Sequence, residues 1–106
     1  MHIRPNGTVS NKLRVYADAM KAVAAQKAVP LVDLNTASQK LYESLGVEGT
    51  AMLGTGPSDR THFSPHGAGV IANIVASELA VAVPELKPYI RQRKVCGGVT
   101  ELGRND

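Results

Sequence analysis

An acid and a base lie three residues apart in residues 57–70, PSDRTHFSPHGAGV. They are Asp59 and His62, and the apolar run that begins after Pro65 predicts a helix directly behind them. A carboxylate that orients an imidazole is the acid–base part of many hydrolytic sites. With His66, the same pair could instead bind a metal ion, since carboxylates and imidazoles are zinc ligands. The stretch could also be a polar loop that caps the helix and does no chemistry.

The elements that position this stretch follow from the hydrophobic pattern upstream of it. Apolar residues recur at steps of three and four between Leu13 and Ala24, which predicts an amphipathic helix of about 15–18 residues with one apolar stripe to bury. Ser10 or Asn11 is expected to cap it. Residues 29–35, VPLVDLN, lack polar alternation, which is typical of a strand covered on both faces, as in a parallel sheet.

Two more helices are predicted after this strand, and a glycine-rich loop at residues 47–64 separates them. Each helix has residues typical of its ends, namely a polar cap, a proline at the first position, or a glycine or proline at the stop. These residues are Asn35 or Thr36 and Gly46 for the first helix, and Ser64, Pro65 and Pro84 for the second. The order helix, strand, helix, loop, helix is that of the later part of an alternating α/β domain.

A single strand cannot satisfy its own backbone hydrogen bonds. Each N–H or C=O group that is buried without a partner costs about 1–3 kcal/mol, and the whole stability of a small domain is only about 5–15 kcal/mol. We therefore expect residues 29–35 to pair with a strand outside the residues assigned above. That strand would come from a missing N-terminal half or, through self-association, from a second copy of the chain.

Composition places the chain in the ordinary globular class and gives no reason to expect a nucleic-acid or membrane partner. Of its 106 residues, 43% are apolar and 20% are charged, and the net charge is +3. The single cysteine, Cys96, excludes an intramolecular disulfide. The longest apolar run is too short to span a bilayer. Nothing after Met1 resembles a signal peptide, and the localisation stays unassigned.

Residues 59–65, DRTHFSP, followed by Gly67-Ala68 and an apolar helix, resemble the last conserved block of the SGNH (GDSL-type) hydrolases. The resemblance is strongest to carbohydrate esterases of the rhamnogalacturonan acetylesterase type. Three upstream segments resemble, in the same order, the helix before the last strand of that family, the strand itself and the short helix after it. They are residues 16–20, YADAM, residues 29–34, VPLVDL, and residues 41–46, LYESLG.

In that family a serine attacks an ester carbonyl, a histidine accepts the serine proton, and an aspartate orients the histidine. The resemblance implies that His62 is the base and Asp59 the orienting acid. It implies no metal or organic cofactor. The implied substrate is an acetylated pectin-type polysaccharide or a small ester, and related esterases are usually secreted.

The sequence departs from the family at the nucleophile. The family's serine lies in a Gly-Asp-Ser block after the first strand, and neither this block nor those that supply the rest of the oxyanion hole occur in the chain. Ser58 and Ser64 flank the pair, but they lie too near His62 in sequence to reach it without strain. The isolated chain is therefore expected to be inactive, because a base without its nucleophile activates nothing.

For several other residues a structural interpretation is favoured over a functional one. Asp33 could belong to a site at the carboxyl end of its strand, or it could bond backbone amides before the next helix. Gly54, Gly56 and Pro57 could contact substrate or form turns. The basic run at residues 91–94 could contact nucleic acid, but no aromatic platform accompanies it and a solvated tail is expected.

The sequence therefore predicts the C-terminal part of a three-layer α/β/α domain of the SGNH (flavodoxin-like) type, mostly helical and with one parallel-type strand. This part covers residues 1–90, and residues 91–106 are expected to form a basic, flexible tail. The predicted function is the His-Asp part of a serine carbohydrate esterase. The alternative is a truncated, non-catalytic α/β fragment that self-associates.

Overall fold

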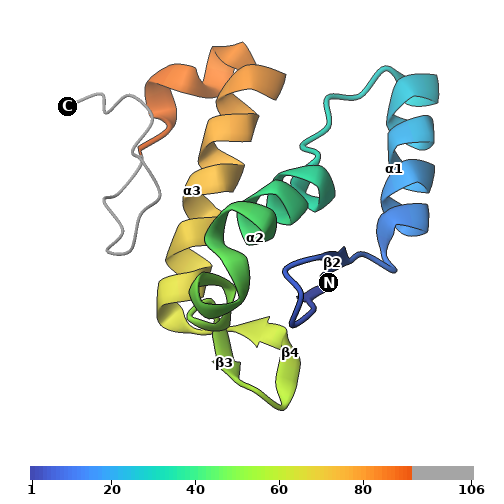
Figure 1. Ribbon diagram of the computed structural model, residues 1–106. Helices are drawn as coiled ribbons and strands as arrows, with labels where there is room; N and C mark the ends of the chain where they lie inside the picture. The colour runs from blue at the N-terminus through green and yellow to red at the C-terminus, as the bar shows by residue number, and fades with distance from the viewer. Residues whose placement is uncertain (92–106) are drawn as a thin grey trace.

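The computed structural model describes residues 1–91, which are mostly helical, as the sequence predicted (Figure 1). The helices are α1 (Arg14–Lys27), α2 (Leu34–Ala51), α3 (Pro65–Ala82) and the 3-10 helix η1 (Pro84–Tyr89). The strands are β1 (His2–Ile3), β2 (Val9–Ser10), β3 (Gly54–Gly56) and β4 (Asp59–Phe63), and they form two antiparallel hairpins, β1–β2 and β3–β4. Apart from Arg91, the predicted tail with Cys96 lies outside the described residues.

The first hairpin forms around the turn signal Asn6-Gly7. Gly7 has a φ of 86°, a left-handed conformation that glycine adopts without steric cost. The Asn6 side chain accepts hydrogen bonds from the N–H and the hydroxyl of Thr8, at 3.1 and 2.7 Å, which fixes the turn. The expected helix cap at Ser10 is therefore wrong, because Ser10 belongs to β2 and is buried against the rest of the chain.

The predicted parallel-type strand at residues 29–35 is absent from the part of the chain that the structure describes. Residues 29–33 have no regular secondary structure, and Leu34 and Asn35 already belong to α2. A strand exists only where a neighbour supplies hydrogen bonds, and both hairpins of the described chain pair within themselves. The predicted caps Asn35 and Thr36 are also wrong by a few residues. Asp33 is the N-cap of α2, and its carboxylate accepts the N–H of Thr36 at 3.1 Å.

Helix α2 is interrupted at Gly46, the residue at which the sequence predicted its end. Gly46 has φ 71° and ψ −171°, a conformation that is essentially restricted to glycine. A short helical stretch continues to Ala51, so part of the predicted loop at 47–64 is helical and the rest holds the β3–β4 hairpin.

The best-packed part of the molecule is the junction between Leu53 and the start of α3. Ser64 caps α3 as predicted, since its Oγ accepts the N–H of Gly67 at 3.0 Å, and Pro65 occupies the first turn. The N–H of Ser64 donates to the carbonyl of Leu53 at 2.9 Å. Leu53 and Val70 are each only 2% exposed. This junction anchors the β3–β4 hairpin to α3.

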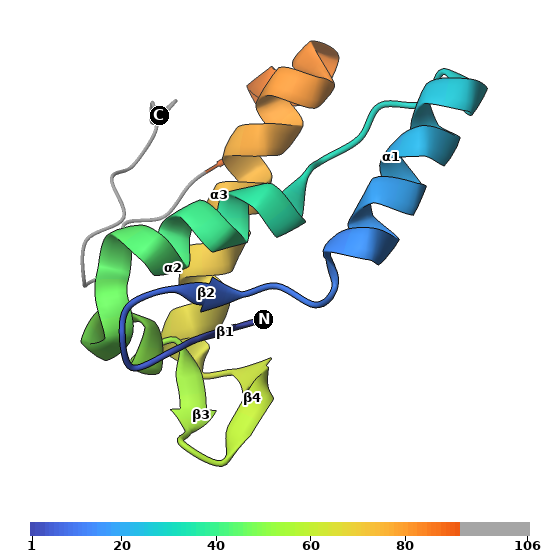
Figure 2. The same cartoon turned by 45° about the vertical axis from the view of Figure 1, so that its right-hand side comes forward.

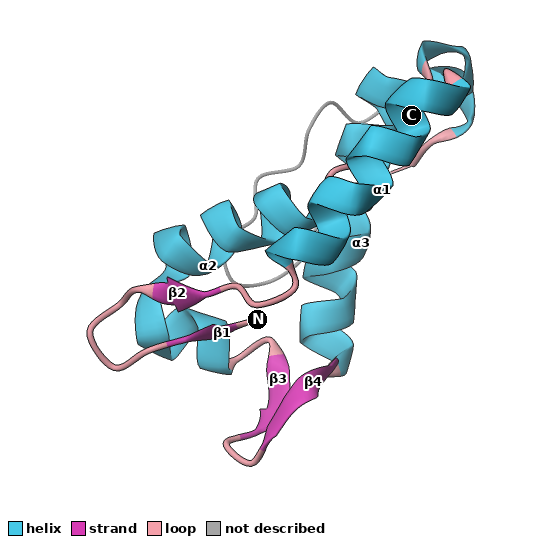
Figure 3. Ribbon diagram, turned by 90° about the vertical axis from the view of Figure 1, so that its right-hand side faces the viewer, coloured by secondary structure: helices cyan, strands magenta, loops and turns pink. Residues whose placement is uncertain are grey.

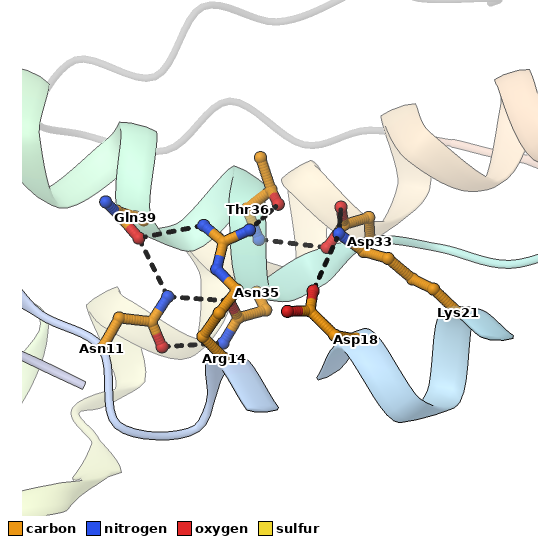
Figure 4. Close-up of polar contacts among 8 residues, drawn as sticks. All are labelled: Asn11, Arg14, Asp18, Lys21, Asp33, Asn35, Thr36 and Gln39. Carbon is orange, nitrogen blue, oxygen red and sulfur yellow. Dashed lines mark hydrogen bonds and ion pairs between the residues drawn. The ribbon is translucent and has the colours of Figure 1, made fainter. Parts of the chain in front are cut away.

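Helix α1 stands apart from α3, with α2 between them in Figure 1, and Figure 2 shows α2 crossing α3 while α1 lies apart. Its contacts to α2 are polar, and Figure 4 shows them. Asn11 and Asn35 exchange two hydrogen bonds of 2.7 and 3.0 Å, and Arg14 donates to Gln39 at 3.2 Å. Lys21 forms an ion pair of 2.8 Å with Asp33. Asn11 thus links the N-terminal segment to α2 and does not cap α1.

The apolar stripe that the sequence expected α1 to bury is exposed in the described chain. Its larger residues are 54–67% exposed: Leu13, Tyr16, Met20 and Val23. Arg14 and Tyr16 lie two positions apart, roughly 200° around an α-helix, so the polar face turned to α2 and the apolar stripe point in opposite directions. The helix therefore turns its apolar stripe away from α2.

Candidate functional site

The second hairpin is irregular at the residues that the sequence singled out. Gly54 pairs with Phe63 and Gly56 with Asp59, so one residue separates the paired ends in β3 whereas three, residues 60–62, separate them in β4. Such a bulge bends a strand and redirects its side chains. Here it turns His62 back toward Asp59.

Asp59 is held by four hydrogen-bond donors. Its Oδ1 accepts the backbone N–H groups of Thr61 and His62, at 2.9 and 3.1 Å. Its Oδ2 lies 2.9 Å from the hydroxyl of Thr55 and 3.0 Å from Nδ1 of His62. These donors hold the pKa of Asp59 well below its usual range. The N–H of Thr61 has the largest effect, then the N–H of His62, the Thr55 hydroxyl and the His62 ring. The carboxylate is therefore ionised at neutral pH.

This arrangement fixes the roles of the two nitrogens of His62. An ionised carboxylate can only accept hydrogen bonds, so Nδ1 of His62 is the donor in the contact with Asp59. In the neutral imidazole, Nε2 then carries the lone pair and can accept a proton. The His62 side chain is 75% exposed and that of Asp59 is 34% exposed. The pair can therefore act as a base toward a group that approaches the hairpin from outside.

A pocket of about 720 Å³ adjoins the pair. It is lined by both hairpins and by α2, and in Figure 3 the β3–β4 hairpin lies below the β1–β2 hairpin. Its walls include the polar residues Asp59, Arg60 and His62 and apolar residues such as Leu34 and Phe63. Its volume is typical of a site for a small molecule or for part of a polymer.

Other predicted residues have mainly structural surroundings. The Oγ of Ser64 donates to the carbonyl of Met52 at 3.0 Å while it caps α3, so it is already engaged in hydrogen bonds that join the hairpin to α3. Asp33 has the structural role that the sequence favoured. Partial burial raises the pKa of Asp33, but hydrogen bonds from Lys21 and Thr36 outweigh this effect and lower it to about 2.

Gly54, Gly56 and Pro57 line the pocket, so a substrate contact by this loop remains compatible with the geometry. Sequence reasoning missed Thr55, whose hydroxyl supports Asp59. Nothing in the sequence pattern marks this threonine, because its role depends on the bulge that brings the end of β3 next to Asp59.

Within residues 1–91, no group of three or more His, Cys, Asp and Glu side chains is placed to hold a metal ion. The alternative site made of Asp59, His62 and His66 therefore has no support from the geometry. No helix in the same residues is both long enough and apolar enough to be a membrane span.

The chain is similar to two bacterial esterases over most of its length. It is 34% identical over 101 residues to the rhamnogalacturonan acetylesterase RhgT of Bacillus subtilis, a match that covers 84% of this chain and 44% of that protein. It is 33% identical over 92 residues to the probable rhamnogalacturonan acetylesterase YesY of the same organism, covering 83% of this chain and 42% of that protein. No protein-family model matches the chain, and no solved structure matches it.

These matches confirm the resemblance predicted from the sequence: the chain is related to the rhamnogalacturonan acetylesterases and resembles a C-terminal portion of them. The chain spans less than half the length of the relatives it matches. The similarity to these esterases and the mostly helical structure both agree with a carbohydrate-esterase-like fragment of an α/β protein.

Proposed function

We propose that the chain supplies the acid–base part of a serine carbohydrate esterase, with His62 as the general base and Asp59 as the residue that orients it. The observation that carries the proposal is the 3.0 Å contact between Nδ1 of His62 and a carboxylate that three further donors hold in place. It occurs in a chain that is 34% identical to a rhamnogalacturonan acetylesterase. We assign an acetylated pectin-type polysaccharide as the substrate class on the strength of that relative.

In this mechanism the nucleophilic serine and the oxyanion donors come from a part of the protein outside this chain. Nε2 of His62 takes the proton of the serine hydroxyl while the serine oxygen attacks the acetyl carbonyl. Asp59 stabilises the imidazolium that forms. The proton then passes to the sugar oxygen as the ester bond breaks and the acetyl group stays on the serine. Water next attacks the acetyl carbonyl while Nε2 of His62 takes its proton, and the serine oxygen leaves with that proton as acetate is released.

The surface of the described chain supports a role as one part of a larger domain. The apolar stripe of α1 points away from α2, and residues 29–33, which follow α1, form no strand. Both features are expected where a segment packs against the rest of an α/β sheet. In the absence of that rest, the same features favour the second candidate, a non-catalytic fragment that self-associates.

A fusion protein tests the proposal. This chain replaces the 101 matched residues of RhgT, and hydrolysis of p-nitrophenyl acetate is measured for the fusion and for the isolated chain. We expect turnover from the fusion and no more than a trace from the chain alone. Robust turnover by the isolated chain that is abolished by His62→Ala would show that this chain contains its own nucleophile. Ser38, which lines the pocket, would be the first residue to replace in that event.

A further inference from the structure

Arg60 is a pocket residue that the proposed mechanism does not use. It lies between Asp59 and His62 in the bulge of β4, and all three residues line the pocket. Two residues of extended chain span no more than about 7 Å, so the Cα atoms of Arg60 and His62 are within that distance. Both side chains therefore line the pocket from one short stretch of β4.

The guanidinium of Arg60 makes no ion pair with a carboxylate within residues 1–91, where the ion pairs are those of Lys21 and His62. The neighbouring carboxylate of Asp59 is occupied by the Thr55 hydroxyl, two backbone N–H groups and the His62 ring. The surroundings of Arg60 also add positive charge. Partial burial, followed by the charges of Arg60 and Arg4, lowers the pKa of His2, which lines the same pocket.

A positive pocket wall with an unpaired arginine is suited to an anion. Arginine presents N–H groups in a planar fork that matches a carboxylate bidentately, and a charge-assisted pair of this kind is stronger than a neutral hydrogen bond. The apolar residues that also line the pocket, such as Leu34 and Phe63, are suited to the carbon face of a sugar ring.

We infer that Arg60 is a specificity residue that binds the carboxylate of a uronic acid, so that the site takes an acetylated acidic sugar in preference to a neutral one. The inference rests on the proposed function for the orientation of the substrate. In a uronic acid the carboxylate is attached to C5, across the pyranose ring from the hydroxyls on C2 and C3. With the carboxylate on Arg60, an acetyl group on one of these hydroxyls is directed toward His62. The galacturonic acid of a rhamnogalacturonan has this chemistry.

Binding to the full chain tests the inference without requiring hydrolysis. Trigalacturonate and the neutral galactose trimer are titrated into the protein, and the amide signals of residues 59–63 are followed by NMR. We expect trigalacturonate to shift these signals and the neutral trimer to bind at least about tenfold more weakly. Arg60→Gln should weaken trigalacturonate binding by at least about tenfold, and Arg60→Lys should restore only part of the loss because the fork is missing.

Lys40→Gln is the matched control, because Lys40 is an exposed cation on α2 away from the pocket. Equal weakening by Arg60→Gln and Lys40→Gln would mean general charge attraction and would overturn the assignment, as would equal binding of the two trimers. Since the readout is binding, its failure is distinguishable from failure of the esterase proposal, which is read from turnover of the fusion.

Discussion

Gly67 stands where a side chain has no room. A Cβ at this position would lie against the carbonyl oxygen of Leu53, which accepts the Ser64 N–H at the start of α3. Glycine to alanine in a helix normally stabilises by up to about 1 kcal/mol. Here we expect Gly67→Ala to lower the free energy of unfolding by about 1–3 kcal/mol, because α3 must move off the hairpin that carries the site.

Urea denaturation measures this change, and Gly56→Ala is its control. A Cβ at Gly56 meets nothing within 4 Å, so this variant should change the free energy of unfolding by less than about 0.5 kcal/mol. A Gly67→Ala protein as stable as the wild type would show that Leu53 and α3 do not make this close contact.

Thr55 holds Asp59 through a hydroxyl, and an isosteric change removes that contact. We expect Thr55→Val to raise the pKa of Asp59 toward the ordinary range, since one of its donors is lost. Thr61→Val should leave the pKa in place, because Thr61 donates through its backbone N–H. NMR titration of the carboxyl carbon measures both. Equal pKa values in the two variants would contradict the account of how Asp59 is kept ionised.

At the scale of elements, α1 is joined to α2 by polar side chains, and its link is sensitive to acid. The pKa of Asp33 is about 2 in the folded chain, below its ordinary value of 3.8. The stabilisation that the ionised Asp33 carboxylate gives the folded chain is therefore fully present above about pH 4. It is lost as the pH falls toward 2, because protonation of Asp33 breaks the contact with Lys21. Both side chains are about one-third exposed, so we expect only about 1 kcal/mol from this pair at pH 7.

Lys21→Met tests this link between the helices. This variant should lower the free energy of unfolding by about 1 kcal/mol at pH 7, and that free energy should fall less steeply in acid. Lys40→Met should change neither the value at pH 7 nor the acid dependence. Denaturation at several pH values from 2 to 7 supplies the curves. An unchanged acid dependence in Lys21→Met would mean that Asp33 is stabilised by other groups.

The elements that the sequence predicted well are those determined by local chemistry. The cap at Ser64, the break at Gly46 and the turn at Asn6-Gly7 each depend on a few neighbouring residues. The predicted strand at 29–35 failed because strand formation depends on a partner that the described residues do not provide. The β3–β4 hairpin was missed because its glycines and its bulge hide the alternation by which strands are recognised.

The same division holds for the candidate site. Asp59 and His62 were predicted as a pair from a short motif, and their contact follows from a three-residue spacing on one bulged strand. The contact of Thr55 with Asp59 could not be predicted, because it depends on the register of β3 against β4. The role proposed for Arg60 depends on the placement of the N-terminal hairpin around the pocket.

At the scale of the whole molecule, the exposed stripe of α1 leads to a prediction about association. Apolar surface of this kind on a helix tends to be covered by another chain or another part of the same protein. We expect the isolated chain to self-associate, and Met20→Lys to shift it toward the monomer. Val81→Lys, at an exposed position on α3, should leave the association unchanged. Sedimentation velocity distinguishes these outcomes, and a sharp wild-type monomer would contradict the expectation.

The esterase account is tested most directly by one comparison in the fusion of this chain with RhgT. His62→Ala should lower kcat/KM for p-nitrophenyl acetate by roughly 100-fold or more, because the general base is lost. His66→Ala, which changes a histidine in the first turn of α3, should leave the rate near that of the parent fusion. Equal rates in the two variants, or a folded fusion without any turnover, would contradict the assignment of Asp59 and His62 as the acid–base half of a hydrolase.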